Sequence, residues 1–136
     1  MIAACIMGLR YYAIVFGLAF AMGVARTLVI APRLGATVAV LLEVPLIVAA
    51  SLVTVRHLLR HCALTFPQGA AMGAVAFTLT MGSEVILARF LRGQSVIAWA
   101  ADVMTPLGLI GLAGQIAFAV MPVLVIQHRN SLRIRS

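Results

Sequence analysis

Long apolar segments separated by short polar ones dominate the pattern of this chain. Each apolar segment holds roughly 20 residues, which as a helix is long enough to cross a hydrocarbon core about 30 Å thick. Four such segments fill the length of the chain and leave no room for a water-soluble domain. The pattern therefore predicts four transmembrane helices, over residues 9–31, 35–60, 67–91 and 103–127.

Proline and glycine mark where these helices turn or bend. Pro32 lacks a backbone N–H donor and Gly35 permits a tight turn, so we expect the chain to reverse between them. Pro45 lies inside the second predicted helix and indicates a kink. Residues 92–102 are predicted to form a loop or an interfacial turn.

Composition supports a membrane protein. The chain has 136 residues, of which 64% are hydrophobic and 10% are charged. So few charges cannot coat the surface of a soluble domain of this size, so lipid must be the solvent for most of the chain. We expect one all-α membrane domain over residues 1–136, a four-helix bundle with both termini on the same side.

Arginine placement sets the expected orientation. Four crossings place both termini on one side of the membrane, and that side holds six of the ten arginines. These six are Arg10, Arg56, Arg60, Arg129, Arg133 and Arg135, whereas Arg26, Arg33, Arg89 and Arg92 lie on the other side. The excess predicts that both termini lie in the cytoplasm. Because these arginines gather at helix ends and not along one face, we expect no nucleic-acid partner.

Three charged residues interrupt the apolar segments, namely Arg26, Glu43 and Glu84. At about 1.5 Å per residue, all three lie roughly 8–10 Å below the outer boundary of the membrane. Arg89 and Asp102 lie just above them. A charge that faced lipid alone would cost about 2.5–3.5 kcal/mol, so we expect these residues to form one cluster inside the bundle.

The role of this cluster is open at the level of sequence. Arg26, Glu43 and Glu84 could form an internal ion-pair knot that fixes helix register. Alternatively, Glu43 or Glu84 could exchange protons or bind a cationic solute, because acids inside a membrane mark such pathways. A catalytic role has less support, because no nucleophile or metal set accompanies the carboxylates.

His57 and His61 lie four residues apart on one predicted helical face, a spacing that can share a metal ion. The same R-H-x-x-R-H pattern is typical of a positive flank where a helix leaves the membrane. No carboxylate accompanies the histidines, which favours the flank, and we expect no cofactor.

Aromatic and small residues indicate how the helices meet lipid and each other. Tyr11, Tyr12 and Trp99 are predicted to be anchors at the membrane interfaces. Strips of small residues, which let helices approach closely, comprise Ala13, Gly17, Ala21 and Ala25 in the first helix and Gly69 and Gly73 in the third. We therefore expect self-association or association with a larger membrane complex.

Part of the chain resembles a known family. The residues that carry the likeness are Arg26, Pro32, Arg33, Leu34, Gly35, Glu43, Pro45, Ala50 and Ser51. Their pattern is similar to that of small four-helix bacterial inner-membrane proteins with no assigned function. The resemblance implies an inner-membrane location and says nothing about activity.

Three functions are compatible with these features. We expect a non-enzymatic accessory or structural membrane subunit. The alternative is an oligomeric proton- or ion-coupled transporter or channel for a small solute, using Glu43 and Glu84. A membrane enzyme acting on a lipid-linked substrate is the third.

Overall fold

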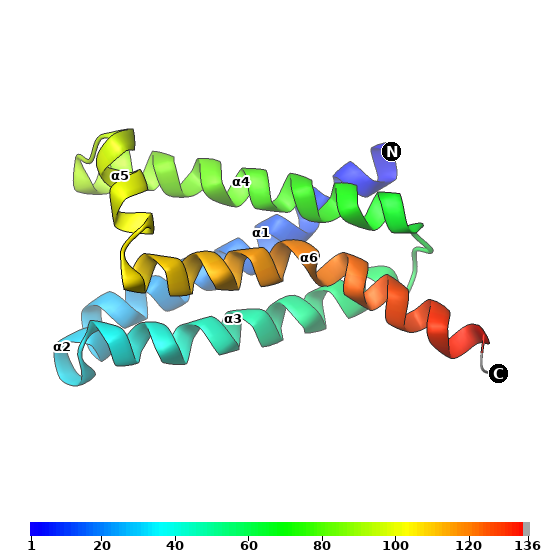
Figure 1. Cartoon of the computed structure of the whole chain (residues 1–136), viewed down its shortest axis with the longest axis horizontal. Helices are drawn as coiled ribbons and strands as arrows, with labels where there is room; N and C mark the ends of the chain where they lie inside the picture. Colours follow the sequence, from blue (N-terminus) through cyan, green and yellow to red (C-terminus); the bar gives the residue numbers. More distant parts are fainter. Residues whose placement is uncertain (135–136) are drawn as a thin grey trace.

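The computed structural model describes the backbone of residues 1–134 and the side chains of residues 1–131. Arg133 and Arg135 were counted among the arginines that predict the orientation of the chain, and they lie outside the described side chains. The elements are helical: α1 (Ile2–Ala25), the π-helical segment η1 (Arg26–Ile30), α2 (Ala31–Leu34), α3 (Ala36–Leu59), α4 (Phe66–Arg92), α5 (Val96–Val103) and α6 (Pro106–Ile134) (Figure 1).

The predicted fold class is confirmed. Four helical spans are long and apolar enough to cross a membrane, namely Ile2–Leu34, Ala36–Leu59, Phe66–Arg92 and Pro106–Ser131. Between residues 1 and 134 the structure has no strand, so the backbone groups of the spans find their partners within helices, as lipid requires. The chain is an all-α membrane protein.

The four long helices form a square bundle. Helices α1 and α6 each pack against both α3 and α4, so α1 and α6 occupy opposite corners. The start of α1 and the last turns of α6 lie at one end, which we call the termini end (Figure 1). Short α2 and α5 lie at the other end, which we call the loop end (Figure 1).

The main hydrophobic cluster occupies the half of the bundle nearest the termini end, whereas the other half has only the small buried residues Ala39 and Ala88 from α3 and α4. Its buried members come from all four long helices: Tyr11, Val15, Val55, Leu59, Met72, Ala76, Phe118, Met121, Val125 and Ile126. No residue of α5, η1 or α2 belongs to this core. The loop end of the bundle is thus held together by other interactions.

The first helix is longer than predicted. It begins at Ile2 and continues to Leu34 through five π-helical residues, whereas we expected residues 9–31 followed by a turn beginning at Pro32. The proline directly follows the π-helical turn, which is wider than an α-helical turn and leaves room for its ring. Only Gly35, with φ +84°, breaks the helix before α3.

The last two elements also differ from the prediction. Residues 92–102 contain a helix, α5, whose N-terminus is capped by the Ser95 side chain. Helix α6 begins at Pro106 instead of residue 103, because Thr105 caps it through the Gly108 N–H. It continues to Ile134 instead of ending at residue 127, because a loss of hydropathy marks the end of the apolar segment and not the end of the helix.

Helices α4 and α6 approach each other most closely at Gly73. A Cβ atom there would overlap the backbone carbonyl of Ala119, and one at Gly69 would overlap the Ile126 side chain. The predicted GxxxG pair is therefore used within the chain, where it brings two backbones together. Gly82, further along α4, is exposed, and a Cβ atom added there would have no neighbour within 4 Å.

Tyr11 crosses the centre of the bundle from α1 to α6. Its hydroxyl donates to the Phe118 carbonyl oxygen at 2.9 Å, and its ring stacks on that of Phe118. In a regular helix this carbonyl would accept from the N–H four residues later, but that residue is Pro122. Tyr11 thus supplies the donor that Pro122 lacks, as buried side chains do in other broken membrane helices.

We predict that Gly73→Ala destabilises the bundle by roughly 1–3 kcal/mol, because the added methyl group forces α4 and α6 apart. The loss is measured as the shift in an SDS unfolding titration of the detergent-solubilised protein followed by circular dichroism. Gly82→Ala is the matched control on the same helix and should leave the titration unchanged or slightly stabilised. Equal effects of the two substitutions would contradict the close approach at Gly73.

We also predict that Tyr11→Phe lowers the free energy of unfolding by roughly 1–3 kcal/mol, because it keeps the stacked ring but leaves a buried carbonyl without a donor. In a Pro122→Ala background, the restored N–H of residue 122 can bond the Phe118 carbonyl. Tyr11→Phe should then cost much less, and a double-mutant cycle measures the difference. Strict additivity of the two substitutions would show that Tyr11 does not compensate for the proline.

Candidate ligand-binding cavity

A cavity of about 930 Å³ lies among the four long helices in the half of the bundle nearest the loop end. Its floor is formed by Val15, Ile47 and Phe118 of the hydrophobic cluster together with the buried Thr80. Its walls are mostly apolar, and all of the predicted charge cluster except Arg89 lines it. Where the core is missing, the bundle therefore holds a space with polar groups on its wall.

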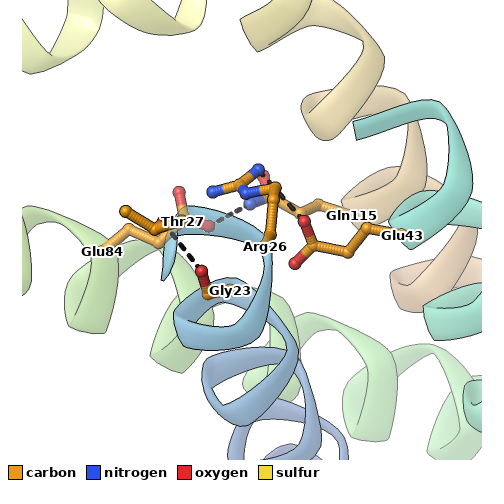
Figure 2. A network of polar contacts seen from close by, with 6 residues as sticks. All are labelled: Gly23, Arg26, Thr27, Glu43, Glu84 and Gln115. Carbon is orange, nitrogen blue, oxygen red and sulfur yellow. Dashed lines mark hydrogen bonds and ion pairs between the residues drawn. The ribbon is translucent and has the colours of Figure 1, made fainter. Parts of the chain in front are cut away.

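Arg26 and Glu43 form an ion pair across the cavity wall. Arg26 Nη1 lies 3.1 Å from Glu43 Oε2, and the two side chains are 36% and 11% exposed respectively. The Glu43 Oε2 atom is itself buried and accepts no aligned hydrogen bond from the described residues, so the contact is one of charge with charge. The pairing expected from equal depth on neighbouring helices is thus present (Figure 2).

Glu84 binds a different partner. Its Oε1 atom accepts a short hydrogen bond from the side-chain amide of Gln115, which joins α4 to α6. In the view of Figure 2, the Arg26 side chain stands between the two glutamates, with its ion pair directed to Glu43 and the Gln115 amide directed to Glu84. The three buried charges thus line one cavity, but they do not form one closed network.

The π-helical segment positions Arg26. In η1 the Ala31 N–H bonds the Arg26 carbonyl, five residues earlier, so this turn is wider than an α-helical turn. The wide turn lies just before Pro32, whose ring would clash with the carbonyl four residues before it in a regular helix. Thr27 satisfies the Gly23 carbonyl at 2.8 Å with its own hydroxyl.

The rim of the cavity carries Asp102 and Arg92. Asp102 accepts a hydrogen bond of 2.6 Å from the Gln94 side chain, and its backbone carbonyl accepts from Thr105. Arg92 lines the cavity, whereas Arg89 is exposed on another face of α4. Arg89 was expected in the cluster, but five residues from Glu84 correspond to about 140° of helical rotation, which turns it away from the cavity.

The two candidate metal ligands lie at the end of α3 that faces the termini end. His57 and His61 are both exposed, and α3 ends at Leu59, so His61 is no longer on the helical face that the spacing assumed. Within the described residues, no group of three or more histidine, cysteine or acidic side chains could hold a metal ion. Their position at the termini end fits the positive flank.

The predicted interface anchors occupy three different environments. Tyr11 is fully buried in the core, so its prediction as an anchor is wrong, and Pro122 provides the physical reason for its burial. Tyr12 is half-buried, and its hydroxyl shares a hydrogen bond with that of Ser83 on α4. Trp99 is half-buried on α5 and lines the cavity.

Two residues of the site were not singled out as site residues from the sequence. Gln115 is an amide on a largely apolar helix, and that isolation is a signal of an interhelical hydrogen bond. Arg92 and Arg89 lie on different faces of α4. Counting the helical rotation of each from Glu84 would have separated them.

The fold and the cavity define a polytopic membrane protein with an ion pair and a separate carboxylate on the wall of an interhelical cavity. Comparisons of the chain with protein-family models, with curated proteins and with solved structures found no match.

We predict that Glu43→Leu lowers the free energy of unfolding by roughly 1–3 kcal/mol, because it leaves the half-buried Arg26 guanidinium without its partner. The Arg26→Leu/Glu43→Leu double variant should lose less than the sum of the single variants, as measured by SDS unfolding in detergent. Arg89→Leu, outside the cavity, is the control and should change stability by no more than about 0.5 kcal/mol. Additive single effects would mean that the two residues do not interact.

Proposed function

We propose that this chain is a small-solute transporter of a bacterial cytoplasmic membrane. Its termini lie in the cytoplasm, and the cavity is its outward-facing solute site. This assignment of sides follows the arginine excess at the termini end of the sequence. The loop end then faces the periplasm, and a solute enters past α5.

The observation that carries the proposal is the cavity itself. At about 930 Å³ it falls within the range of roughly 300–1,000 Å³ that is typical of small-molecule sites. It also has the usual make-up of such sites, with apolar walls and a few polar groups, here Arg26, Glu43, Glu84 and Gln115. The volume of the cavity is large enough for a small solute within a bundle of this size.

The position of the packed residues relative to the cavity supports transport. The cavity is closed towards the termini end by the main hydrophobic cluster, none of whose residues comes from α5, η1 or α2 at the loop end. A site that is closed on one side of the membrane and open on the other is the arrangement that alternating access requires. Membrane-buried carboxylates such as Glu43 and Glu84 are the groups that bind coupling protons or ions in such proteins.

A second candidate is the accessory subunit expected from the sequence. It is favoured by the strip of small residues on α1, because Ala13, Gly17, Ala21 and Ala25 are all exposed and not used within the bundle. Gly17 has no neighbour within 4 Å of a Cβ position, so another helix could pack there. A subunit of this kind would co-purify with its complex and lose that association in Gly17→Leu.

The outward-open cavity is tested by thiol accessibility. Gly111 lines the cavity with open space around it, so Gly111→Cys should react in intact cells with a maleimide that cannot cross membranes. The reaction is measured by gel shift in a background in which Cys5 and Cys62 are replaced by serine.

The matched control is Gly82→Cys, which points outward from the same half of the bundle into lipid and should not react. If Gly111→Cys reacts only after the cells are permeabilised, the orientation is reversed. If neither cysteine reacts in either preparation, the cavity holds no water and the transporter proposal fails.

A further inference from the structure

The charges on the cavity wall do not balance. Arg26 neutralises Glu43, but within the described residues the Glu84 carboxylate accepts a hydrogen bond only from the neutral amide of Gln115. Among the side chains that the structure describes, no arginine or histidine nitrogen lies within ion-pair distance of Glu84. The inner wall therefore carries an excess of one negative charge when both glutamates are ionised.

The second oxygen of Glu84 remains available as an acceptor. It accepts no hydrogen bond from the described part of the chain, and it points away from Gln115 in Figure 2. Glu43 Oε2, in contrast, is occupied by its ion pair with Arg26. An unpaired carboxylate oxygen beside a space favours a ligand that brings N–H donors, and a cation makes the strongest such bonds with a carboxylate.

The rest of the cavity lining favours a ligand with an apolar body. The cavity is bordered by Phe16, Phe20, Phe118 and Trp99 together with aliphatic side chains of all four long helices. Aromatic faces attract cations as well as apolar groups. A bare inorganic ion would leave most of a space of about 930 Å³ unfilled.

We infer that the cavity takes a small organic cation, an ammonium or guanidinium group on an apolar body, whose charged group binds Glu84. This inference names the substrate class of the proposed transporter and rests on that proposal. The positive group donates to the free Glu84 oxygen while the body lies against the aromatic wall.

Three probes with one aromatic body separate charge from shape. They are phenethylammonium, 2-phenylethanol and 3-phenylpropionate, which are cationic, neutral and anionic. Binding of each to the purified full-length chain in lipid nanodiscs is measured by isothermal titration calorimetry, with empty nanodiscs as the background. We expect phenethylammonium to bind at least about tenfold more tightly than the other two.

Variants of the chain assign the selectivity to Glu84. Glu84→Gln, which can still bond Gln115, should weaken phenethylammonium binding about tenfold or more, and Glu84→Asp should retain part of it. Arg89→Gln, outside the cavity, should change nothing. Circular dichroism of each variant establishes that it is folded.

The outcomes separate this inference from the proposed function. Equal binding of the three probes, or no binding of the cation, overturns the cation assignment, as does undiminished binding in a folded Glu84→Gln variant. In each of these cases, reaction of Gly111→Cys with the impermeant maleimide would leave the outward-open cavity standing. Lack of that reaction in both intact and permeabilised cells overturns the transporter itself.

Discussion

The contact of α4 with α6 at Gly73 brings the backbones of two membrane helices together, because any side chain there would overlap the Ala119 carbonyl. The large buried side chains gather in the same half of the bundle, and residues of the other half line a cavity. One half of the bundle is thus packed and the other is hollow.

The second constraint is that backbone groups inside lipid must find partners within the protein. The chain meets this constraint in different ways at its prolines. Before Pro32 the helix widens into a π-helical turn, and at Pro122 the hydroxyl of Tyr11 replaces the missing donor. These solutions are local to the cavity or to its floor, so the irregularities of the backbone and the candidate site lie together.

Much of the fold was predictable because hydropathy, proline and glycine act locally. Helix α3 differs from its prediction by one residue at each end, and α4 does the same, because Gly35, Pro67 and Gly93 fix the boundaries. The last turns of α6 were not predicted, because they are polar and lie outside the apolar segment. The buried position of Tyr11 depends on a carbonyl 107 residues away, which no local pattern reveals.

The site was predictable in part, for a similar reason. Rise per residue placed Arg26 and Glu43 at equal depth, and they do form an ion pair. The depth of a residue in the membrane does not indicate the direction of its side chain, however. Arg89 was therefore assigned to the cluster although it lies on another face of α4. The cavity is lined by residues of all four long helices, so it is a tertiary property to which each segment contributes only part.

The wide turn at Arg26–Ile30 has a consequence for the whole connection between the first two membrane spans. One extra residue in a helical turn rotates everything after it by about 100° relative to everything before it. The packed face of α1 and the direction in which the chain leaves towards α3 are therefore set independently of each other. A single-residue deletion within the turn would therefore rotate both the Arg26–Glu43 ion pair and the connection to α3. The hydrophobic core, which lies further along α1 towards the termini end, would keep its register.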